Sequence, residues 1–199
     1  MKRLVIHPKN PQARHIRAAA DVLETGGLIV YPTDSVYGLG CDLFNKNAIE
    51  KIYQRKGNDK RKLLSFICPD LKEISEYAYV PDFAYKIMRR LLPGPYTFIL
   101  TATKRVPRIL LEKRKTVGIR VPDNAVCKAL LAEFGRPIIS TSARLADQPF
   151  LDNPDEIAET FKRIAEIFLD SGPGSLEPST VIDFTEDEPT VIRQGKGKL

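Results

Sequence analysis

The fold is predicted most directly from residues 27–40, GLIVYPTDSVYGLG. The apolar run 28–31 indicates a buried strand, and Pro32 should end its pairing because proline cannot donate a ladder hydrogen bond. Hydroxyl side chains follow the strand at once, and they either face a ligand or tie down the turn. These side chains belong to Thr33, Ser35 and Tyr37. The end of this strand is therefore the first candidate site.

Helical and strand patterns alternate along the rest of the chain. We expect helices at 11–25, 47–53, 123–134 and 154–164, one or two helices within 70–92, and a short helix within 104–115. Strands are expected at 63–67, 96–103, 116–121, 137–140, 166–170, 179–184 and 189–193, with a loop at 55–62. This alternation predicts a single α/β domain over residues 1–199, α+β in some schemes, with helices packed on a sheet. The last two strands should form a hairpin, so the sheet should be mixed.

Local capping residues mark the expected helix ends. Asn10-Pro11 and Asn153-Pro154 each place an N-cap residue before a proline at the first helical position. Asp123 is expected to cap the helix at 123–134, and Gly135 is expected to end it.

Composition excludes several classes of protein. No apolar run approaches the ~20 residues that span a bilayer, and the first residues are too short an apolar run for a signal peptide, so a soluble, cytoplasmic protein is expected. Cys41, Cys68 and Cys127 lack the spacing of a zinc site or a disulfide framework. The two histidines, His7 and His15, lie near the N-terminus, which argues against a Ser-His-Asp or Cys-His mechanism.

Charge is distributed unevenly along the chain. The net charge is +6, yet residues 147–188 hold twelve acidic side chains against two basic ones, so the remainder carries +16. Basic side chains concentrate at 51–62 and 104–115. Such runs form either a solvated face or a surface for nucleotide phosphates or an RNA backbone. No P-loop is present, so side chains would have to bind the phosphates of any nucleotide.

Several short motifs resemble, in order, those of the YrdC/YciO superfamily, and the wording is closest to its YciO branch. Besides residues 27–40, the motifs are Lys56-Gly57 with Lys62-Leu63-Leu64, Pro93-Gly94-Pro95-Tyr96-Thr97, residues 116–122 (TVGIRVP), Ser140-Thr141-Ser142-Ala143, Ser179-Thr180-Val181 and Arg193-Gln194-Gly195. The resemblance covers about residues 10–195. It implies a twisted mixed sheet flanked by helices, with a concave basic face.

The best-understood members of this superfamily are threonylcarbamoyl-AMP synthases, which act in tRNA t6A modification. The resemblance implies a nucleotidyltransferase that joins L-threonine, bicarbonate and ATP and releases pyrophosphate. Such a reaction needs positioning and charge neutralisation more than a protein nucleophile. Mg²⁺ would accompany ATP, held by phosphates and water, since no dedicated carboxylate cage is evident.

The resemblance also assigns roles to individual residues. Lys56 and Arg120 are the expected catalytic residues, and Arg120 is expected to clamp the amino-acid carboxylate. The expected substrate-binding residues are Thr33, Ser35, Tyr37, Arg120, Ser140 and Ser179. The expected nucleotide-binding residues are Lys56, Lys62, Thr116, Ser142 and Arg193. The residues alone leave another interpretation open, in which the arginines form ion pairs and the serines cap turns.

Some positions depart from the synthase pattern. Where synthases commonly have K-G-R-P-x-x-K-P-L, this chain has Asn58, Asp59 and Leu63 in place of the arginine and the two prolines, and Arg144 replaces the asparagine of S-T-S-A-N. Weakened synthase activity is therefore one expectation. A tRNA-binding, double-stranded-RNA-binding or ribosome-associated protein is the alternative, and a nucleotide-binding enzyme with another acyl substrate is a third. RNA contact should be driven by shape and phosphates, because few aromatic residues interleave with the basic runs.

Overall fold

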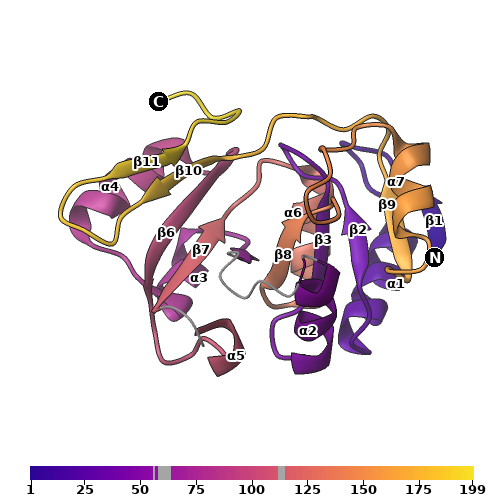
Figure 1. Ribbon diagram of the computed structural model, residues 1–199, viewed down its shortest axis with the longest axis horizontal. Coiled ribbons are helices and arrows are strands. Elements are labelled where there is room, and N and C mark those ends of the chain that lie inside the picture. The colour runs from indigo at the N-terminus through magenta and orange to yellow at the C-terminus, as the bar shows by residue number, and fades with distance from the viewer. Residues whose placement is uncertain (56, 58–63, 112–114) are drawn as a thin grey trace.

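A computed structural model describes residues 1–55, 57, 64–111 and 115–199 (Figure 1). The strands are β1 (Lys2–Val5), β2 (Ile29–Tyr31), β3 (Gly38–Asp42), β4 (Ser65–Ile67), β5 (Ala78–Tyr79), β6 (Tyr96–Ala102), β7 (Thr116–Arg120), β8 (Ile138–Ser142), β9 (Ile167–Asp170), β10 (Thr180–Asp183) and β11 (Thr190–Arg193). The helices are α1 (Ala13–Glu24), α2 (Lys46–Arg55), α3 (Leu71–Tyr77), α4 (Asp82–Leu91), α5 (Arg108–Leu111), α6 (Ala125–Phe134) and α7 (Pro154–Phe161). The expected loop at 55–62 lies almost entirely outside the described residues.

One mixed sheet joins all of these strands, as the sequence predicted. Its order is β1-β9-β2-β3-β8-β4-β7-β6-β10-β11, and β5 pairs with β6. The pairs β1–β9, β2–β9, β4–β7 and β6–β10 are parallel, whereas the other pairs are antiparallel, including the expected hairpin β10–β11. The sheet twists strongly between its two ends, and helices cover it on both faces (Figure 1).

Both faces of the central part of the sheet are buried, and residues along these central strands alternate between two apolar cores. In β2, Ile29 and Tyr31 join α1 and α6 in one core, whereas Val30 joins the core that contains α2 and α7. The same alternation holds in β8, where Ile138 and Ile139 lie in different cores. A sheet buried on both faces explains why its central strands are continuous apolar runs.

The buried ring of Tyr31 packs against the glycines of β3. Its hydroxyl donates to Ser140 Oγ at 2.7 Å, and β3 crosses beside the ring with glycine at 38 and 40. A Cβ atom at Gly38 would lie 2.9 Å from Tyr31 Cζ, and one at Gly40 would lie 2.9 Å from Cε1. Any larger residue at either position would have to displace the Tyr31 ring, so glycine is favoured at both. The strand β3 was not expected from the sequence.

Two of the expected helix caps are displaced by a few residues. The first helix begins at Ala13 after Gln12, rather than at Asn10-Pro11, because His7 Nδ1 accepts hydrogen bonds from the Lys9 and Asn10 amides and holds that segment in a separate turn. In α6 the cap is Asn124, whose Oδ1 accepts from the amides of residues 126 and 127. Asp123 lies one residue before the cap, and its amide donates to Asp34.

The remaining boundaries follow the sequence prediction more closely. Asn153 caps α7, and Gly135 ends α6 with a φ of 72°. The segment 70–92 forms two helices, α3 and α4, with β5 between them, and α5 is the short helix expected within 104–115. In the described residues, none of the helices combines the length and the apolar character that crossing a bilayer requires.

Candidate functional site

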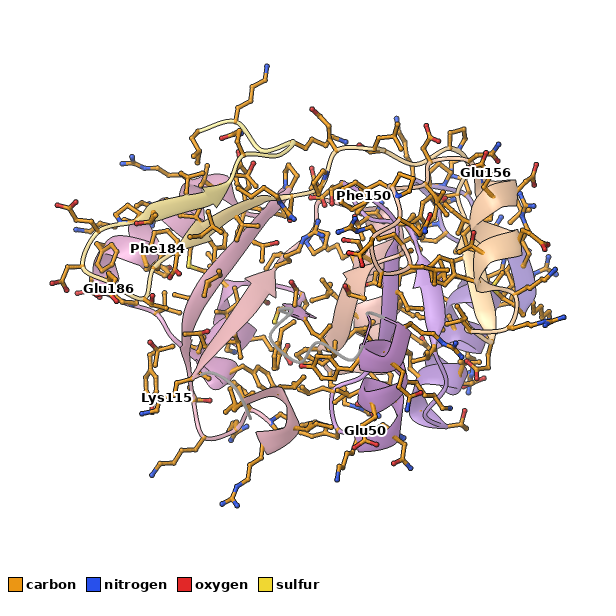
Figure 2. The ribbon with its side chains drawn as sticks, viewed as in Figure 1. Glu50, Lys115, Phe150, Glu156, Phe184 and Glu186 are labelled. Atoms are coloured by element: carbon orange, nitrogen blue, oxygen red, sulfur yellow. The ribbon has the colours of Figure 1, made fainter. Side chains whose placement is uncertain are left out.

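A cavity of about 350 Å³ opens at the ends of several central strands. Its described lining residues are Val36, Tyr37, Ser65, Ile67, Thr97, Ile99, Arg120, Ser140, Thr141, Ser142, Arg144, Phe150, Ser179, Val181 and Arg193. Three guanidiniums and a set of hydroxyls dominate this lining, and none of these residues is acidic. We call it the arginine cavity; Phe150 marks its position at the upper middle of Figure 2.

The cavity brings together six of the residues predicted from the sequence. They are Tyr37, Arg120, Ser140, Ser142, Ser179 and Arg193. Thr33 and Ser35 line a neighbouring cavity of about 200 Å³, which shares Tyr37 with the first. Thr116 begins β7, at the opposite end of that strand from Arg120, and is not among the described lining residues. Lys56 and Lys62 lie outside the described residues.

Arg120 is buried and holds an ion pair at the floor of the cavity. Its Nη2 donates to Asp34 Oδ1 at 2.7 Å and to Ser35 Oγ at 3.0 Å, and only 8% of the residue is exposed. The other Asp34 oxygen accepts from the Asp123 amide at 2.9 Å. Arg120 Nε is buried and has no hydrogen-bond partner among the described residues. The ion-pair interpretation is thus confirmed for Arg120, and a buried donor remains for a ligand to satisfy.

Arg193 reaches the cavity from β11 and is anchored by one backbone carbonyl. Its Nε and Nη2 donate to Ser179 O at 3.1 and 2.8 Å. Ser179 Oγ in turn lies 2.7 Å from Thr97 Oγ1. Burial lowers the pKa of Arg193, and the positive charges of Arg120 and Arg144 lower it further. The cavity therefore concentrates positive charge that an anion would neutralise.

Several of the predicted hydroxyls hold the backbone in place. Thr33 Oγ1 donates to Val36 O at 2.7 Å and accepts from the Ser35 amide. The Tyr37 hydroxyl donates to Gly172 O at 2.6 Å, and burial raises its pKa. Ser140 Oγ accepts from the Tyr31 hydroxyl. The turn-fastening interpretation is confirmed for Thr33. Tyr37 instead bonds a distant loop, and Ser140 lies in β8 and bonds the Tyr31 side chain. Direct ligand contact by all three stays a prediction.

Sequence reasoning did not assign five polar or aromatic residues of the described lining to the site: Ser65, Thr97, Thr141, Arg144 and Phe150. Arg144 was noted only as a departure from a family motif, although its position directly after residues 140–143 was a usable signal. Its guanidinium lies over the Phe150 ring, 4.7 Å from the centroid, and Nη1 donates to Gln148 O at 2.8 Å. Phe150 carries no recognisable local signal, because an irregular loop brings it to the cavity.

The described cavity residues do not fit a metal ion held by the protein. Guanidiniums repel cations, and Asp34, the carboxylate that contacts Arg120, is committed to that guanidinium. Nowhere in residues 1–55, 57, 64–111 and 115–199 do three His, Cys, Asp or Glu side chains form a group that could hold one. The donor set suits an oxyanion with several charges instead.

Comparison with known proteins matches this chain to one family along most of its length. A family model for Sua5, YciO and YrdC proteins, described as "Telomere recombination", matches residues 21–195. The uncharacterized protein YciO of Escherichia coli is 44% identical over 98% of this chain and 95% of its own length. The crystal structure of E. coli YciO superposes with a TM-score of 0.95, covering 100% of this chain and 98% of that one.

More distant relatives carry the name of an enzyme. A threonylcarbamoyl-AMP synthase of Pyrococcus abyssi is 32% identical over 90% of this chain, which spans 54% of the synthase. Another, from Vibrio vulnificus, is 29% identical over 91% of this chain and 98% of its own length. The structure of P. abyssi Sua5 complexed with L-threonine superposes with a TM-score of 0.91 at 29% identity, covering 98% of this chain and 58% of that one.

Proposed function

Because this chain belongs to the Sua5/YciO/YrdC family, we propose that it is a nucleotidyltransferase that forms an acyl adenylate from ATP, bicarbonate and L-threonine. Relatives at about 30% identity that are named threonylcarbamoyl-AMP synthase support this proposal. The observation that carries it is the arginine cavity, in which three guanidiniums and several hydroxyls converge without an acidic lining residue among those described. The product would serve tRNA modification.

The proposed reaction forms two bonds. The amine of L-threonine attacks bicarbonate, which gives a carbamate and releases water. A carbamate oxygen then attacks the α-phosphorus of ATP, and pyrophosphate leaves. Each step needs alignment of the reactants and neutralisation of phosphate charge, which fixed guanidiniums supply in a partly buried site. Mg²⁺ would enter as part of the ATP substrate, and no step here depends on a protein ligand to it.

The amino acid is assigned to the floor of the cavity, by the family resemblance and by the contacts there. Arg120 Nε is a buried donor that a substrate carboxylate would satisfy, while Nη2 stays on Asp34. Ser35 and Ser179 would add neutral hydrogen bonds. Arg193, at the more exposed side, would neutralise phosphate oxygens. Lys56 and Lys62 are assigned to the nucleotide by resemblance alone.

Mass spectrometry tests the proposal directly. The protein is incubated with ATP, bicarbonate and each amino acid in turn, and pyrophosphate and the acyl adenylate are measured. We expect threonylcarbamoyl-adenylate only when bicarbonate is present, and about tenfold to a hundredfold less product from Arg193→Ala. Arg17→Ala is the matched control, because Arg17 is an exposed residue of α1 outside the cavity lining. Absence of any adenylate with every amino acid would contradict the proposal.

RNA binding is a second candidate function, favoured by one observation. Exposed basic side chains lie on α2 (Lys51, Arg55) and around α5 (Lys104, Arg108, Lys115). Both helices lie at the lower edge of Figure 1, and Lys115 is at that edge in Figure 2. We call these five residues the lower basic edge. It would bind tRNA or double-stranded RNA through phosphates, at the opposite end of β7 from Arg120.

A further inference from the structure

We propose that Arg144, positioned by the ring of Phe150, binds the phosphate chain of the nucleotide, together with Arg193. The inference rests on the proposed function, because it assigns part of the ATP substrate to a named pair of residues. Neither Arg144 nor Phe150 was among the residues expected to bind substrate or nucleotide. Both line the arginine cavity and both are half-buried.

The loop after β8 is shaped to fix the guanidinium in one place. The Arg144 amide donates to Ser142 O at 2.8 Å, and Nη1 donates to Gln148 O at 2.8 Å. Asp147 adopts a φ of 58°, in the left-handed region that few L residues occupy, and this bends the loop back. The bend places the Phe150 ring centroid 4.7 Å from the guanidinium carbon. A stacked arginine loses less freedom when it binds a ligand, so its contacts are pre-organised.

Electrostatics inside the cavity favour an anion that carries more than one charge. Arg120 has Asp34 as its ion-pair partner, whereas Arg193 is held by the neutral oxygens of Ser179. Burial and the charge of Arg120 lower the pKa of Arg193 most, and the charge of Arg144 lowers it further, so Arg144 and Arg193 repel each other in the free protein. A single carboxylate is satisfied by one guanidinium. A phosphate chain has oxygens enough for both, and binding it would relieve their repulsion.

The fold brings these two arginines together from distant strands. Arg144 follows β8, and Arg193 ends β11, with β4, β7, β6 and β10 between them in the sheet. The hydroxyl side chains of Thr97, Ser179 and Ser142 lie in the same lining. A ligand held between Arg144 and Arg193 would therefore cross the cavity over the floor at Arg120. This arrangement separates a phosphate region near the two arginines from an amino-acid region near Arg120.

Isothermal titration calorimetry with inorganic tripolyphosphate, pyrophosphate and phosphate tests the inference without requiring catalysis. Arg144→Asn should weaken tripolyphosphate binding by about tenfold to a hundredfold, with a smaller loss for phosphate and no change for adenosine. Phe150→Leu should lose part of the affinity for tripolyphosphate, whereas Phe150→Tyr, which keeps an aromatic face, should retain it. Arg17→Asn removes the same charge from the exposed face of α1 and should leave binding unchanged.

The outcomes separate this inference from the proposed function. Unchanged tripolyphosphate affinity in Arg144→Asn would overturn the inference, even if the wild-type protein makes an adenylate. An equal loss in Arg17→Asn would also overturn it, because net charge alone would then explain binding. A selective loss in Arg144→Asn supports it, even if no adenylate is formed. Thermal melting checks that each variant is folded. If Arg144→Asn does not fold, Arg144→Lys replaces it, and we expect this variant to lose less affinity. In that case, wild-type tripolyphosphate affinity in Phe150→Leu would overturn the inference.

Discussion

Replacing Asp34 by asparagine should move stability and anion binding in opposite directions. Asp34 accepts from Arg120 Nη2 at 2.7 Å and from the Asp123 amide at 2.9 Å. Only 8% of the Asp34 side chain and 10% of the Arg120 side chain are exposed. The substitution leaves a buried guanidinium without its countercharge but leaves the cavity surface almost unchanged in shape.

The size of the stability loss follows from the burial of the pair. Removing one partner of a buried ion pair costs ~3–5 kcal/mol. Asparagine still offers one neutral acceptor to Arg120, so we expect about 3 kcal/mol, at the lower end of that range. With a urea m-value of ~2 kcal/mol/M, the unfolding midpoint should fall by about 1.5 M. Urea titration followed by circular dichroism measures the shift.

Anion binding should improve in the same variant. The uncompensated Arg120 adds a full positive charge to the cavity floor, so tripolyphosphate should bind about tenfold more tightly. At a hundred times its Kd, bound tripolyphosphate should raise the free energy of unfolding by ~2.7 kcal/mol. Asp42→Asn is the matched control: Asp42 pairs with Arg136 at 2.9 Å, and neither residue is among the described lining of the cavity. It should lose stability without a change in anion affinity. A loss below about 1 kcal/mol for Asp34→Asn, or unchanged anion affinity, would refute the reasoning.

Three further predictions test the packing, the titration and the surface. Burial raises the pKa of the Cys127 thiol above its ordinary value of 9.0, so the unfolded chain loses this proton first and stability falls as pH rises above about 9. Cys127→Ser should make that fall shallower by about 1.4 kcal/mol per pH unit in urea titrations, and identical slopes would contradict it. Gly38→Ala should lower the free energy of unfolding by about 1–3 kcal/mol, because the new methyl group meets the Tyr31 ring. A smaller side chain at position 31 should recover part of that loss, and an unchanged urea midpoint in Gly38→Ala would rule this out. Charge reversal at Arg108 and Lys115 should make the slope of log K for tRNA binding against log salt concentration shallower, by ~0.7–0.9 for each phosphate that these side chains no longer neutralise. An unchanged slope in filter binding would contradict RNA binding by the lower basic edge.

Strands with a strong local signal were predictable from the sequence, and strands made by their neighbours were not. The run 28–31 is apolar and ends at a proline, so β2 was evident. In contrast, β3 contains two glycines and no β-branched residue, and its extended form comes from pairing with β2 on one side and β8 on the other. The strand β1 buries only Leu4 of its four residues, so its alternation was too weak to detect.

The candidate site was predictable where hydroxyls and arginines end strands. Arg120, Ser140 and Arg193 lie at or near strand ends, and the sheet brings them to one cavity. Thr116 was assigned by resemblance, yet it begins the strand that Arg120 ends. The stacking of Arg144 on Phe150 was beyond local reasoning, because it depends on a bent loop rather than on a periodic pattern.

The position of Arg193 in the chain has a consequence for how the protein is made. All other described residues of the arginine cavity precede it, and Arg193 is placed by β11 pairing with β10, which in turn pairs with β6. During synthesis the strands from β1 to β6 in the sheet order can therefore pair before β11 brings Arg193 to the cavity. An incomplete chain released before β11 would retain most of the apolar core but lack the cation that Ser179 anchors. A nascent chain should thus become able to bind an anion in this cavity only after β11 has been synthesised and has paired with β10.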